Sequence, residues 1–413
     1  MSLYDKIDWE DLKNRALSCI HCAMCRQTLP SETKNNAYAD TCPAGLYFNF
    51  EAYYPPGRNE IARAIIRNEY PLQDSEKLQE VIFSCTTCGA CEIHCKYIVD
   101  MNVCPTDIME KIRAKLVKEG IGPLPAQIKF SEHVKQTKNS YGEITERNAW
   151  FNDIAYKDKG SAEIFYFVGC TTGFRQQELG NNTVNILKNV KADFTISSKE
   201  ICCGSPLIRT GQLDQVEDLV KENVELIKKT GSKTVLFSCA GCYRTVSRDW
   251  PEILGKNLPF DTIHISEFAA NKIENKKLKF SKKLNEKVVY HDPCHLGRHM
   301  HPNRVYEQPR YVLDNIPGIE RKIFYREKDE SLCCAAGGGV KAGMPEFSEY
   351  IAALRVDEAR AVGAETIVTT CPFCIRGLND GAEKEAKDSG KTKIKVKSLT
   401  RLINEALGGI NHE

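Results

Sequence analysis

The chain has 413 residues, a formal net charge of +2 and an apolar fraction of 42%. This length predicts several domains of about 100–200 residues with buried cores, and the near-neutral charge excludes a long-range field for nucleic acid or an anionic membrane. Apolar runs such as Ile164–Val168 have strand length and fall short of the roughly 20 residues of a membrane span. With no apolar signal region near the N-terminus, we expect a cytoplasmic protein that associates with a membrane only through a partner subunit.

Nineteen cysteines dominate the composition. In a reducing compartment thiolates bind metals rather than pair into disulfides, and the odd number leaves at least one cysteine outside any all-disulfide scheme. Adjacent Cys-Cys pairs and CxxC repeats do not close into relaxed local disulfides, but they bring several sulfurs to one point. We therefore interpret the cysteines as metal ligands.

Residues 1–118 are predicted to form short helices separated by cysteine-bearing turns. Apolar residues at helical spacing predict helices over Asp8–Ser18, Asn59–Asn68, Ser75–Phe83 and Thr106–Glu119. The last of these follows Pro105 and stops at Gly120, which is typical of a helix. The polar residues that follow, 119–160, contain Gly122, Pro123 and Pro125 and are interpreted as a linker.

Residues 161–413 have an α/β pattern. Short β-branched or aromatic runs predict strands over Glu163–Val168, Thr234–Phe237, Lys287–Tyr290 and Thr366–Thr369, each followed directly by a cysteine motif. Helical patterns such as Leu213–Lys229 and Phe347–Val362 lie between them. Alternation of strand and helix favours a parallel sheet, which places its functional sites at the carboxyl ends of its strands.

The cysteine motifs of this second part occur twice, in the order lone Cys, Cys-Cys, CxxC. Cys170 corresponds to Cys294, and the pair Cys202-Cys203 to Cys333-Cys334. The repeat divides the part into two copies of one module, residues 161–283 and 284–413. The predicted fold is therefore a small helical domain followed by two α/β modules with parallel-sheet character.

Two groups of cysteines in residues 1–118 have the spacing of a two-cluster ferredoxin. Three cysteines two residues apart wrap one cubane, and in two-cluster ferredoxins the remote fourth cysteine ligates the other cluster. We therefore predict one [4Fe–4S] cubane on Cys19, Cys22, Cys25 and Cys95, and another on Cys85, Cys88, Cys91 and Cys42. Structural zinc, which closes at four ligands, is the alternative. Cys104 is a further candidate ligand, which we interpret as a buried thiol.

Each module carries five cysteines, more than a cubane or a zinc ion needs. They are Cys170, Cys202, Cys203, Cys239 and Cys242 in the first module and Cys294, Cys333, Cys334, Cys371 and Cys374 in the second. Adjacent cysteines point in different directions and can bind separate irons, while neighbouring glycines such as Gly337–Gly339 let backbone approach a bulky inorganic core. Buried structural cysteines are the alternative, but they do not explain why the pattern occurs twice.

The paired modules resemble the cysteine-rich CCG domains of heterodisulfide reductases. The whole chain resembles the D-subunit family of these enzymes, in which a two-cluster ferredoxin domain is fused to two such modules. The resemblance extends to Cys42-Pro-Ala-Gly-Leu, Pro56-Gly-Arg-Asn-Glu-Ile-Ala-Arg63 and His291-Asp-Pro-Cys-His-Leu-Gly297. It implies that each module binds one noncubane [4Fe–4S] cluster through all five cysteines, which makes these ten the catalytic ligands. Ala335 stands where the family usually has the glycine of CCG, and no ligand is lost by it.

This resemblance implies two-electron reduction of the coenzyme M–coenzyme B heterodisulfide that ends methanogenesis, with electrons relayed through the cubanes to the noncubane pair. The expected partners are the disulfide and an electron donor, which could be a membrane cytochrome b, a flavoprotein, or a hydrogenase or formate dehydrogenase module. One alternative is an electron conduit such as the iron–sulfur subunits of glycerol-3-phosphate, glycolate or lactate dehydrogenases. Another is the related subunit of sulfite-reduction complexes. Two complete modules favour the disulfide enzyme, since a conduit needs no paired noncubane site.

Histidines and basic residues complete the candidate site. His295, beside Cys294, is a candidate proton donor to a leaving thiolate, with a structural role as the alternative, whereas His21 and His94 are interpreted as spare residues among the cubane ligands. Basic residues at matching places in the two modules could bind the anionic arms of the substrate, or form salt bridges inherited with the module. They are Arg175, Arg209, Arg244, Arg298, Lys341 and Arg376.

Overall fold

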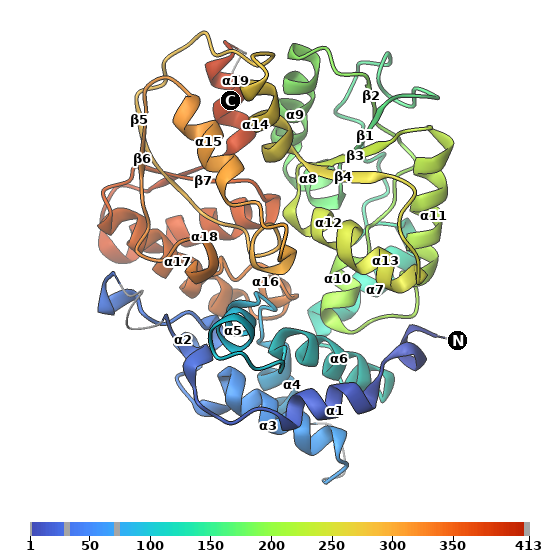
Figure 1. The fold of residues 1–413 in the computed structure, drawn as a ribbon, viewed down its shortest axis with the longest axis vertical. Coiled ribbons are helices and arrows are strands. Elements are labelled where there is room, and N and C mark those ends of the chain that lie inside the picture. Colours follow the sequence, from blue (N-terminus) through green and yellow to red (C-terminus); the bar gives the residue numbers. More distant parts are fainter. Residues whose placement is uncertain (1, 29–33, 70–74, 409–413) are drawn as a thin grey trace.

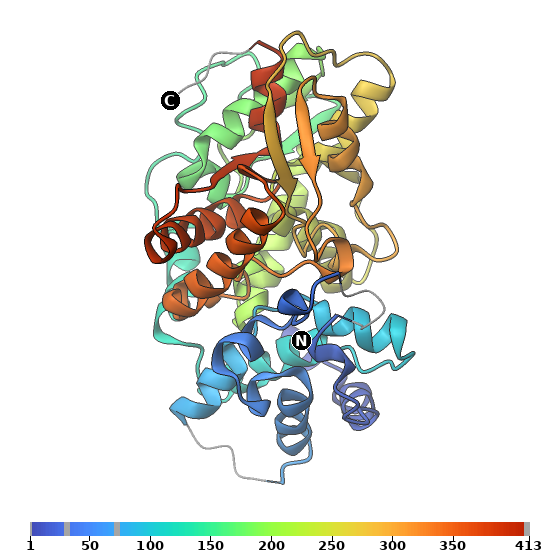
Figure 2. The ribbon, with the colours of Figure 1, turned by 90° about the vertical axis from the view of Figure 1, so that its left-hand side faces the viewer.

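The computed structural model describes residues 2–28, 34–69 and 75–408. A helical ferredoxin-type part lies at one end of the molecule, beneath two α/β modules that stand next to each other (Figure 1). The view turned by 90° shows the same division (Figure 2). A helical domain followed by two parallel-sheet modules is the fold class that the sequence predicts, and it is confirmed.

Short helices and turns build the ferredoxin-type part, as expected. Its helices are α1 (Trp9–Leu17), α2 (Pro43–Phe48), α3 (Pro55–Ile66), α4 (Glu76–Phe83), α5 (Ala90–Ile93) and α6 (Pro105–Lys118). The Asp8 carboxylate caps α1 by accepting from the Asp11 backbone N–H at 2.9 Å. Pro105 opens α6 and Gly120 follows it at φ +80°, so both predicted boundary signals act as expected. Around α6, apolar residues such as Ile108 and Ile112 form a core of their own.

The two modules repeat one sheet topology. Parallel strands are ordered β2-β1-β3-β4 in module 1 and β6-β5-β7-β8 in module 2. The strands are β1 (Ile164–Phe167), β2 (Phe194–Thr195), β3 (Thr234–Phe237), β4 (Asp261–His264), β5 (Glu286–Tyr290), β6 (Ile319–Lys322), β7 (Thr366–Thr369) and β8 (Lys395–Ser398). The central strands of each sheet, β1 and β3 or β5 and β7, end where the cysteine motifs begin. Because the strands are parallel, the cysteines of each module lie at the same edge of its sheet, at the carboxyl ends of the strands.

Helices cover both faces of the sheets. In module 1 they are α8 (Cys170–Arg175), α9 (Gln177–Asn189), α10 (Ser205–Thr210), α11 (Val216–Lys229), α12 (Ala240–Arg244), α13 (Trp250–Leu254) and α14 (Ile265–Glu274). In module 2 they are α15 (Glu307–Asn315), α16 (Val340–Gly343), α17 (Pro345–Ala361), α18 (Pro372–Ser389) and α19 (Leu399–Ala406). One continuous apolar core contains residues of both modules, including Phe237, Met300 and Leu378. The modules therefore share their interior rather than meet through a thin contact.

Residues 119–160, expected to link the domains, contain α7 (Pro125–Thr137) and a segment packed against module 1. We call residues 138–151 the strap. The Lys138 carbonyl accepts from the Cys202 backbone N–H at 2.8 Å, and the Asn148 side chain donates to the Ser197 carbonyl at 2.8 Å. Earlier in the same segment, Gln127 of α7 donates to the Gly339 carbonyl of module 2 at 3.1 Å. This part of the chain therefore touches both modules.

Candidate iron–sulfur sites

Cys19, Cys22, Cys25 and Cys95 line one small cavity of the ferredoxin-type part. Burial raises the pKa of Cys95 to about 11, and Cys19 and Cys22 add to the rise. The remote cysteine of the second motif thus lies beside the first motif, which is the crossed arrangement predicted from the spacing.

The second cavity is lined by Cys42, Cys85, Cys88 and Cys91. Burial raises the pKa of Cys42 to about 11, and the Thr87 backbone N–H donates to Cys85 Sγ at 3.4 Å. Cys104 belongs to neither set: it is half-buried rather than buried, and its Sγ lies 3.4 Å from Asn102 Oδ1.

The crowding of buried sulfurs in these two sites indicates whether the sites fit iron–sulfur clusters. Burial raises the pKa of both Cys25 and Cys91, and neighbouring cysteines raise it further. Such sulfurs hold thiolate charge only with cations among them. An iron–sulfur cluster supplies those cations to four converging cysteines, so each set fits one cluster.

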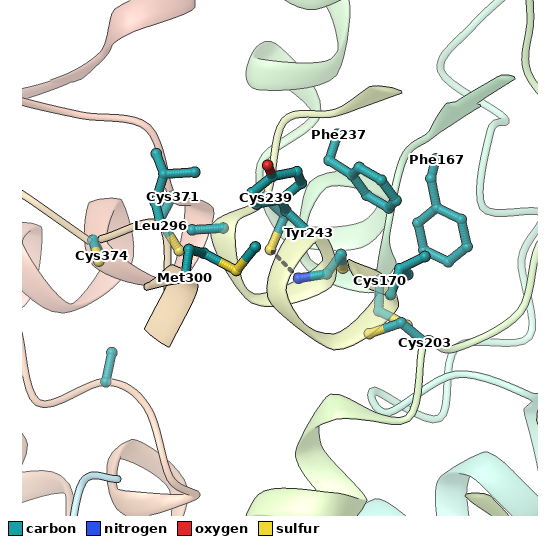
Figure 3. Packing of buried hydrophobic residues seen from close by; sticks show 14 of the residues in the cluster. Phe167, Cys170, Cys203, Phe237, Cys239, Tyr243, Leu296, Met300, Cys371 and Cys374 are labelled. Carbon is teal, nitrogen blue, oxygen red and sulfur yellow. Dashed lines mark hydrogen bonds between the residues drawn. The ribbon is translucent and has the colours of Figure 1, made fainter. Parts of the chain in front are cut away.

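All ten cysteines of the two modules line a single cavity of about 280 Å³. Figure 3 shows the two sides of this arrangement, with Cys371 and Cys374 facing Cys170, Cys203 and Cys239 across the gap. Cys334 Sγ lies 3.3 Å from Cys374 Sγ within module 2. Cys239 of module 1 and Cys371 of module 2 lie in one buried cluster, and Cys371 contributes to raising the pKa of Cys239. The cavity is therefore a joint between the modules, and each contributes five sulfurs.

The ferredoxin-type part touches this cavity through its second set. Cys88 and Cys333 pack in one buried cluster, where Cys333 contributes to lowering the pKa of Cys88. The loop of Gly337–Gly339 lies against residues 85–86. A Cβ on Gly338, which has φ +63°, would lie 2.8 Å from the Cys85 carbonyl oxygen. Only glycine allows this approach. Sulfur contacts thus run from the ferredoxin-type part to module 2 and from module 2 to module 1.

Histidines approach the cysteines of module 2. His291 lies with Cys334 and Cys374, and His295 with Cys294 and His299, in groups whose ligand atoms are within 4.8 Å of one another. Burial, with Arg209 nearby, lowers the pKa of His295 to about 3, so its imidazole is neutral at pH 7. His291 was not among the residues expected from the sequence, although its place at the end of β5 is the signal that would have identified it.

The two spare histidines lie away from this cavity. His21 Nε2 lies 2.7 Å from Glu60 Oε2 at the surface, and the buried His94 has Nε2 3.2 Å from Glu330 Oε2.

Three of the six candidate basic residues line the cavity: Arg209, Lys341 and Arg376. Arg376 donates to the Tyr141 hydroxyl at 3.0 Å, and Lys341 pairs with Asp380. The guanidinium of Arg209 is buried between Glu110 and Asp249, which neutralise it.

The other three are not among the residues that line the cavity. Arg244 donates to Asp249 at 2.8 Å and Arg175 to Glu143 at 2.6 Å. Arg298 donates to the carbonyls of Cys88 and Ser331 at 2.9 and 2.6 Å. The repeat therefore does not place the six equivalently. Those of module 1 pair with acidic residues of α6, of the strap and of module 1 itself, whereas those of module 2 meet backbone carbonyls, a carboxylate and a tyrosine hydroxyl.

Residues 119–160 supply cavity residues that the sequence pattern did not indicate: Phe130, Ser140 and Tyr141. The Tyr141 hydroxyl lies 3.0 Å from Thr171 Oγ1 of module 1 and accepts from Arg376 of module 2. No cysteine or repeat marks this polar stretch, so its pattern carries no signal of the contact.

Comparison with known families assigns all three parts of the chain. The cysteine-rich domain model, CCG, matches residues 164–247 and 288–379, and the 4Fe-4S dicluster domain model matches residues 15–99. Residues 100–163, with α7 and the strap, lie outside these matches.

Curated relatives match nearly the whole length of this chain. The D subunit of the dihydromethanophenazine:CoB–CoM heterodisulfide reductase of Methanosarcina barkeri is 38% identical over 95% of this chain and 94% of its own. The B subunit of the fumarate reductase (CoM/CoB) of Methanothermobacter marburgensis is 33% identical over 97% of this chain and 74% of its own. The EtfAB:quinone oxidoreductase of Syntrophomonas wolfei is 28% identical over 93% of this chain and 57% of its own.

A solved structure supports the fold alone. A hypothetical protein from Helicobacter pylori matches 74% of this chain and 58% of its own with a TM-score of 0.50 at 10% identity. In the described ranges, no helix is both long and apolar enough to span a bilayer.

Proposed function

Because the chain belongs to the D-subunit family of heterodisulfide reductases, we propose that this iron–sulfur oxidoreductase subunit reduces the coenzyme M–coenzyme B disulfide. The reaction is R–S–S–R′ + 2 e⁻ + 2 H⁺ → R–SH + R′–SH, in which one S–S bond breaks and two S–H bonds form. The observation that carries the proposal is the single cavity lined by the ten module cysteines. An electron-donating partner subunit supplies both electrons.

The proposed ligand sets are the two crossed ferredoxin sets and the five cysteines of each module. When bound, the clusters supply one-electron carriers and two iron sites that could each take one sulfur of the breaking bond. The protein holds the two module sites on opposite walls of one cavity, so both sulfurs of a disulfide could be reached without moving the substrate. An imidazole nitrogen of His295 is placed to hold a proton beside Cys294.

The contacts between cysteines support an order of electron arrival. Cys88 of the ferredoxin-type part meets Cys333 of module 2, and Cys371 of module 2 meets Cys239 of module 1. Electrons entering the ferredoxin-type part would therefore reach module 2 before module 1.

Thiol release tests the proposal directly. Anaerobic protein with reduced viologen as donor should convert the coenzyme M–coenzyme B disulfide into two thiols per two viologens oxidised. Absence of thiol release from protein with its full iron content would reject the function.

A conduit is the second candidate, because relatives of similar architecture include one component of the fumarate reductase (CoM/CoB). In that case the chain would carry electrons between a partner and another active site. Viologen oxidation by the isolated chain with disulfide as sole acceptor separates the two, since a conduit has no acceptor of its own.

Iron analysis tests the cofactor content. Two cubanes and two noncubane clusters predict about sixteen irons per chain. The expected result for anaerobically reconstituted protein is a value near this number, with sulfide in equal amount. A value near eight would remove the noncubane sites and leave only the ferredoxin-type ligands.

Arg376→Ala should raise the KM for the anionic heterodisulfide by about tenfold to a hundredfold, the effect of losing one charged hydrogen bond. Arg376 is half-buried in the cavity wall and donates there to the neutral Tyr141 hydroxyl, so its charge could face a substrate anion. Arg360→Ala, which breaks an ion pair with Glu385 away from the cavity, is the matched control. An equal rise in KM for a neutral disulfide would make Arg376 part of the scaffold.

A further inference from the structure

Arg147 brings a cation from the strap to the lone cysteine of module 1. The residue is 4% exposed, and its Nη2 donates to Cys170 Sγ at 3.5 Å. Its other terminal nitrogen pairs with the fully buried carboxylate of Glu200. Although burial alone would lower it, the charges of Cys170 and Glu200 raise the pKa of Arg147, so the guanidinium is charged at every working pH.

The surroundings fix this side chain in place. A Cβ on Gly173 would lie 2.5 Å from Arg147 Cγ, so the absence of a side chain there lets the arginine pass. The Trp150 indole N–H donates to the Arg147 carbonyl at 3.0 Å. Glu200 also accepts the backbone N–H groups of Val168 and Gly169 at 2.7 and 2.9 Å. One carboxylate therefore orients both the arginine and the backbone that leads into Cys170.

In module 2, the buried arginines contact the region of the sulfurs in a different way. Its buried Arg355 donates through Nε to His291 Nδ1 at 3.4 Å, and His291 in turn approaches Cys334 and Cys374. The hydrogen bonds of Arg298, the arginine that follows Cys294, go to backbone carbonyls. The buried charge of Arg298 still lies close enough to Cys294 and Cys333 for these sulfurs to raise its pKa. Among the described residues of module 2, however, no arginine donates a hydrogen bond to a module sulfur, whereas in module 1 Arg147 does.

A cation that hydrogen-bonds to a ligand sulfur stabilises the more negative, reduced form of an iron–sulfur site and raises its reduction potential. The effect is strong in a buried site, where little water screens the charge. The Nε–H of Arg147 is buried and has no partner among the described residues. The guanidinium therefore keeps one N–H donor that no described protein acceptor uses.

We propose that Arg147 is a positioning residue that raises the reduction potential of the module 1 site above that of the module 2 site. An electron arriving at module 2 from the ferredoxin-type part is then drawn on to module 1, and module 2 is free to receive the second. The strap, which no matched domain covers, is the element that makes the two repeated modules unequal. The inference rests on the noncubane sites of the proposed function.

EPR-monitored redox titration of the holoprotein tests this role. Arg147→Gln removes the charge and should shift the one-electron equilibrium of one noncubane step at least tenfold toward the oxidised form, a fall of about 59 mV in its midpoint. The other noncubane step and the cubanes should not move. Arg147→Lys keeps the charge and should keep this midpoint close to that of the unaltered protein. Arg321→Gln, which removes an arginine paired with Asp314 at the surface of module 2, should leave all midpoints unchanged.

Glu200→Gln provides the opposite change. It removes the carboxylate that competes for Arg147 while its amide oxygen can still accept from the Val168 and Gly169 backbone. The same noncubane midpoint should therefore rise, because a buried carboxylate no longer offsets the charge of Arg147. Unchanged midpoints in Arg147→Gln, equal shifts in the Gln and Lys variants, or loss of module 1 iron in all three would overturn the proposal. Iron content and noncubane signals of the unaltered protein test the underlying function separately.

Discussion

Replacing Cys371 with serine is expected to lower disulfide reduction by more than about a hundredfold, beyond the loss that follows removal of an outer-shell partner of a metal site. Cys371 follows β7 and its thiol meets Cys239 of module 1, so it stands where the two walls of the cavity touch. Serine is shorter and its hydroxyl is a harder, far less acidic ligand than a thiol. The ferredoxin-type part has its own core, and its cubane spectra should remain. Thiol release and EPR of the same anaerobic preparation measure both effects.

Two further variants sharpen this result. Cys239→Ser changes the contacting cysteine of module 1 and should have a comparable effect, because both walls are needed for a two-electron cleavage. Cys104→Ser is the control, since its sulfur lies in neither ferredoxin set, and it should retain activity and iron. Near-normal turnover in both Cys371→Ser and Cys239→Ser would reject the paired-site mechanism.

Much of the fold was predictable because its signals are local. The helix predicted over Thr106–Glu119 is α6, bounded by proline and glycine, and the strands predicted before the cysteine motifs are β1, β3, β5 and β7. The grouping of Cys95 with Cys19, Cys22 and Cys25 joins residues about 70 apart, and it was predictable only because two motifs of this spacing are typical of a two-cluster ferredoxin. The helix and the strands depend on residues close together in the chain, and the repeat supplies the strands twice.

Contacts between distant segments were not predictable in the same way. Arg209 and Lys341 occupy similar places in the repeat, but Arg209 is buried between Glu110 of α6 and Asp249, whereas Lys341 pairs with Asp380 of its own module. Arg147 lies in a polar stretch with no periodicity. Its position beside Cys170 depends on Gly173, which leaves room for its side chain, and on Glu200, which pairs with it, and both belong to module 1. Sequence pattern assigns residue types to a module, whereas the neighbours decide which charges remain available for a substrate.

Replacing Arg113 with methionine is expected to produce the largest loss of stability. The Arg113 side chain, on α6, is fully buried and joins all three parts of the molecule. It donates to the carbonyls of Ile82 and Cys85 in the ferredoxin-type part, of Arg209 in module 1 at 2.7 Å and of Gly338 in module 2 at 3.1 Å. Burial lowers the pKa of Arg113 to about 10, with the charge of Cys85 acting against this, so the side chain stays charged at pH 7.

Methionine fills a similar volume and donates no hydrogen bond, so the four carbonyls lose their donor. Each buried acceptor left unpaired costs about 1–3 kcal/mol, and their shared cation makes the losses less than additive. We expect a total of at least about 3 kcal/mol. With an unfolding entropy of about 2.1 cal/mol/K per residue, this corresponds to a fall of roughly 3–4 °C or more in the anaerobic unfolding midpoint of a chain of 413 residues. Because a protein with several domains and bound clusters does not unfold in a single two-state step, the unfolding midpoints of the unaltered protein and the variant are compared under identical conditions.

Electron entry should fail along with stability. Arg113 holds the Cys85 carbonyl and the Gly338 carbonyl on one guanidinium, and these two loops carry Cys88 and Cys333 into contact. In Arg113→Met, reduction of the module sites by way of the ferredoxin-type part should therefore slow more than reduction of the cubanes, as stopped-flow absorbance with a reduced donor would show. Arg113→Lys keeps the charge but has fewer N–H donors, so its rate of module reduction should lie between those of the unaltered protein and Arg113→Met. Arg401→Met, at a part-buried ion pair of α19 with Glu405 that lies outside the ferredoxin-type part, controls for loss of an arginine elsewhere in the molecule. Parallel slowing of cubane and module reduction would mean that Arg113 supports the ferredoxin-type part alone, and that the contact between Cys88 and Cys333 does not depend on it.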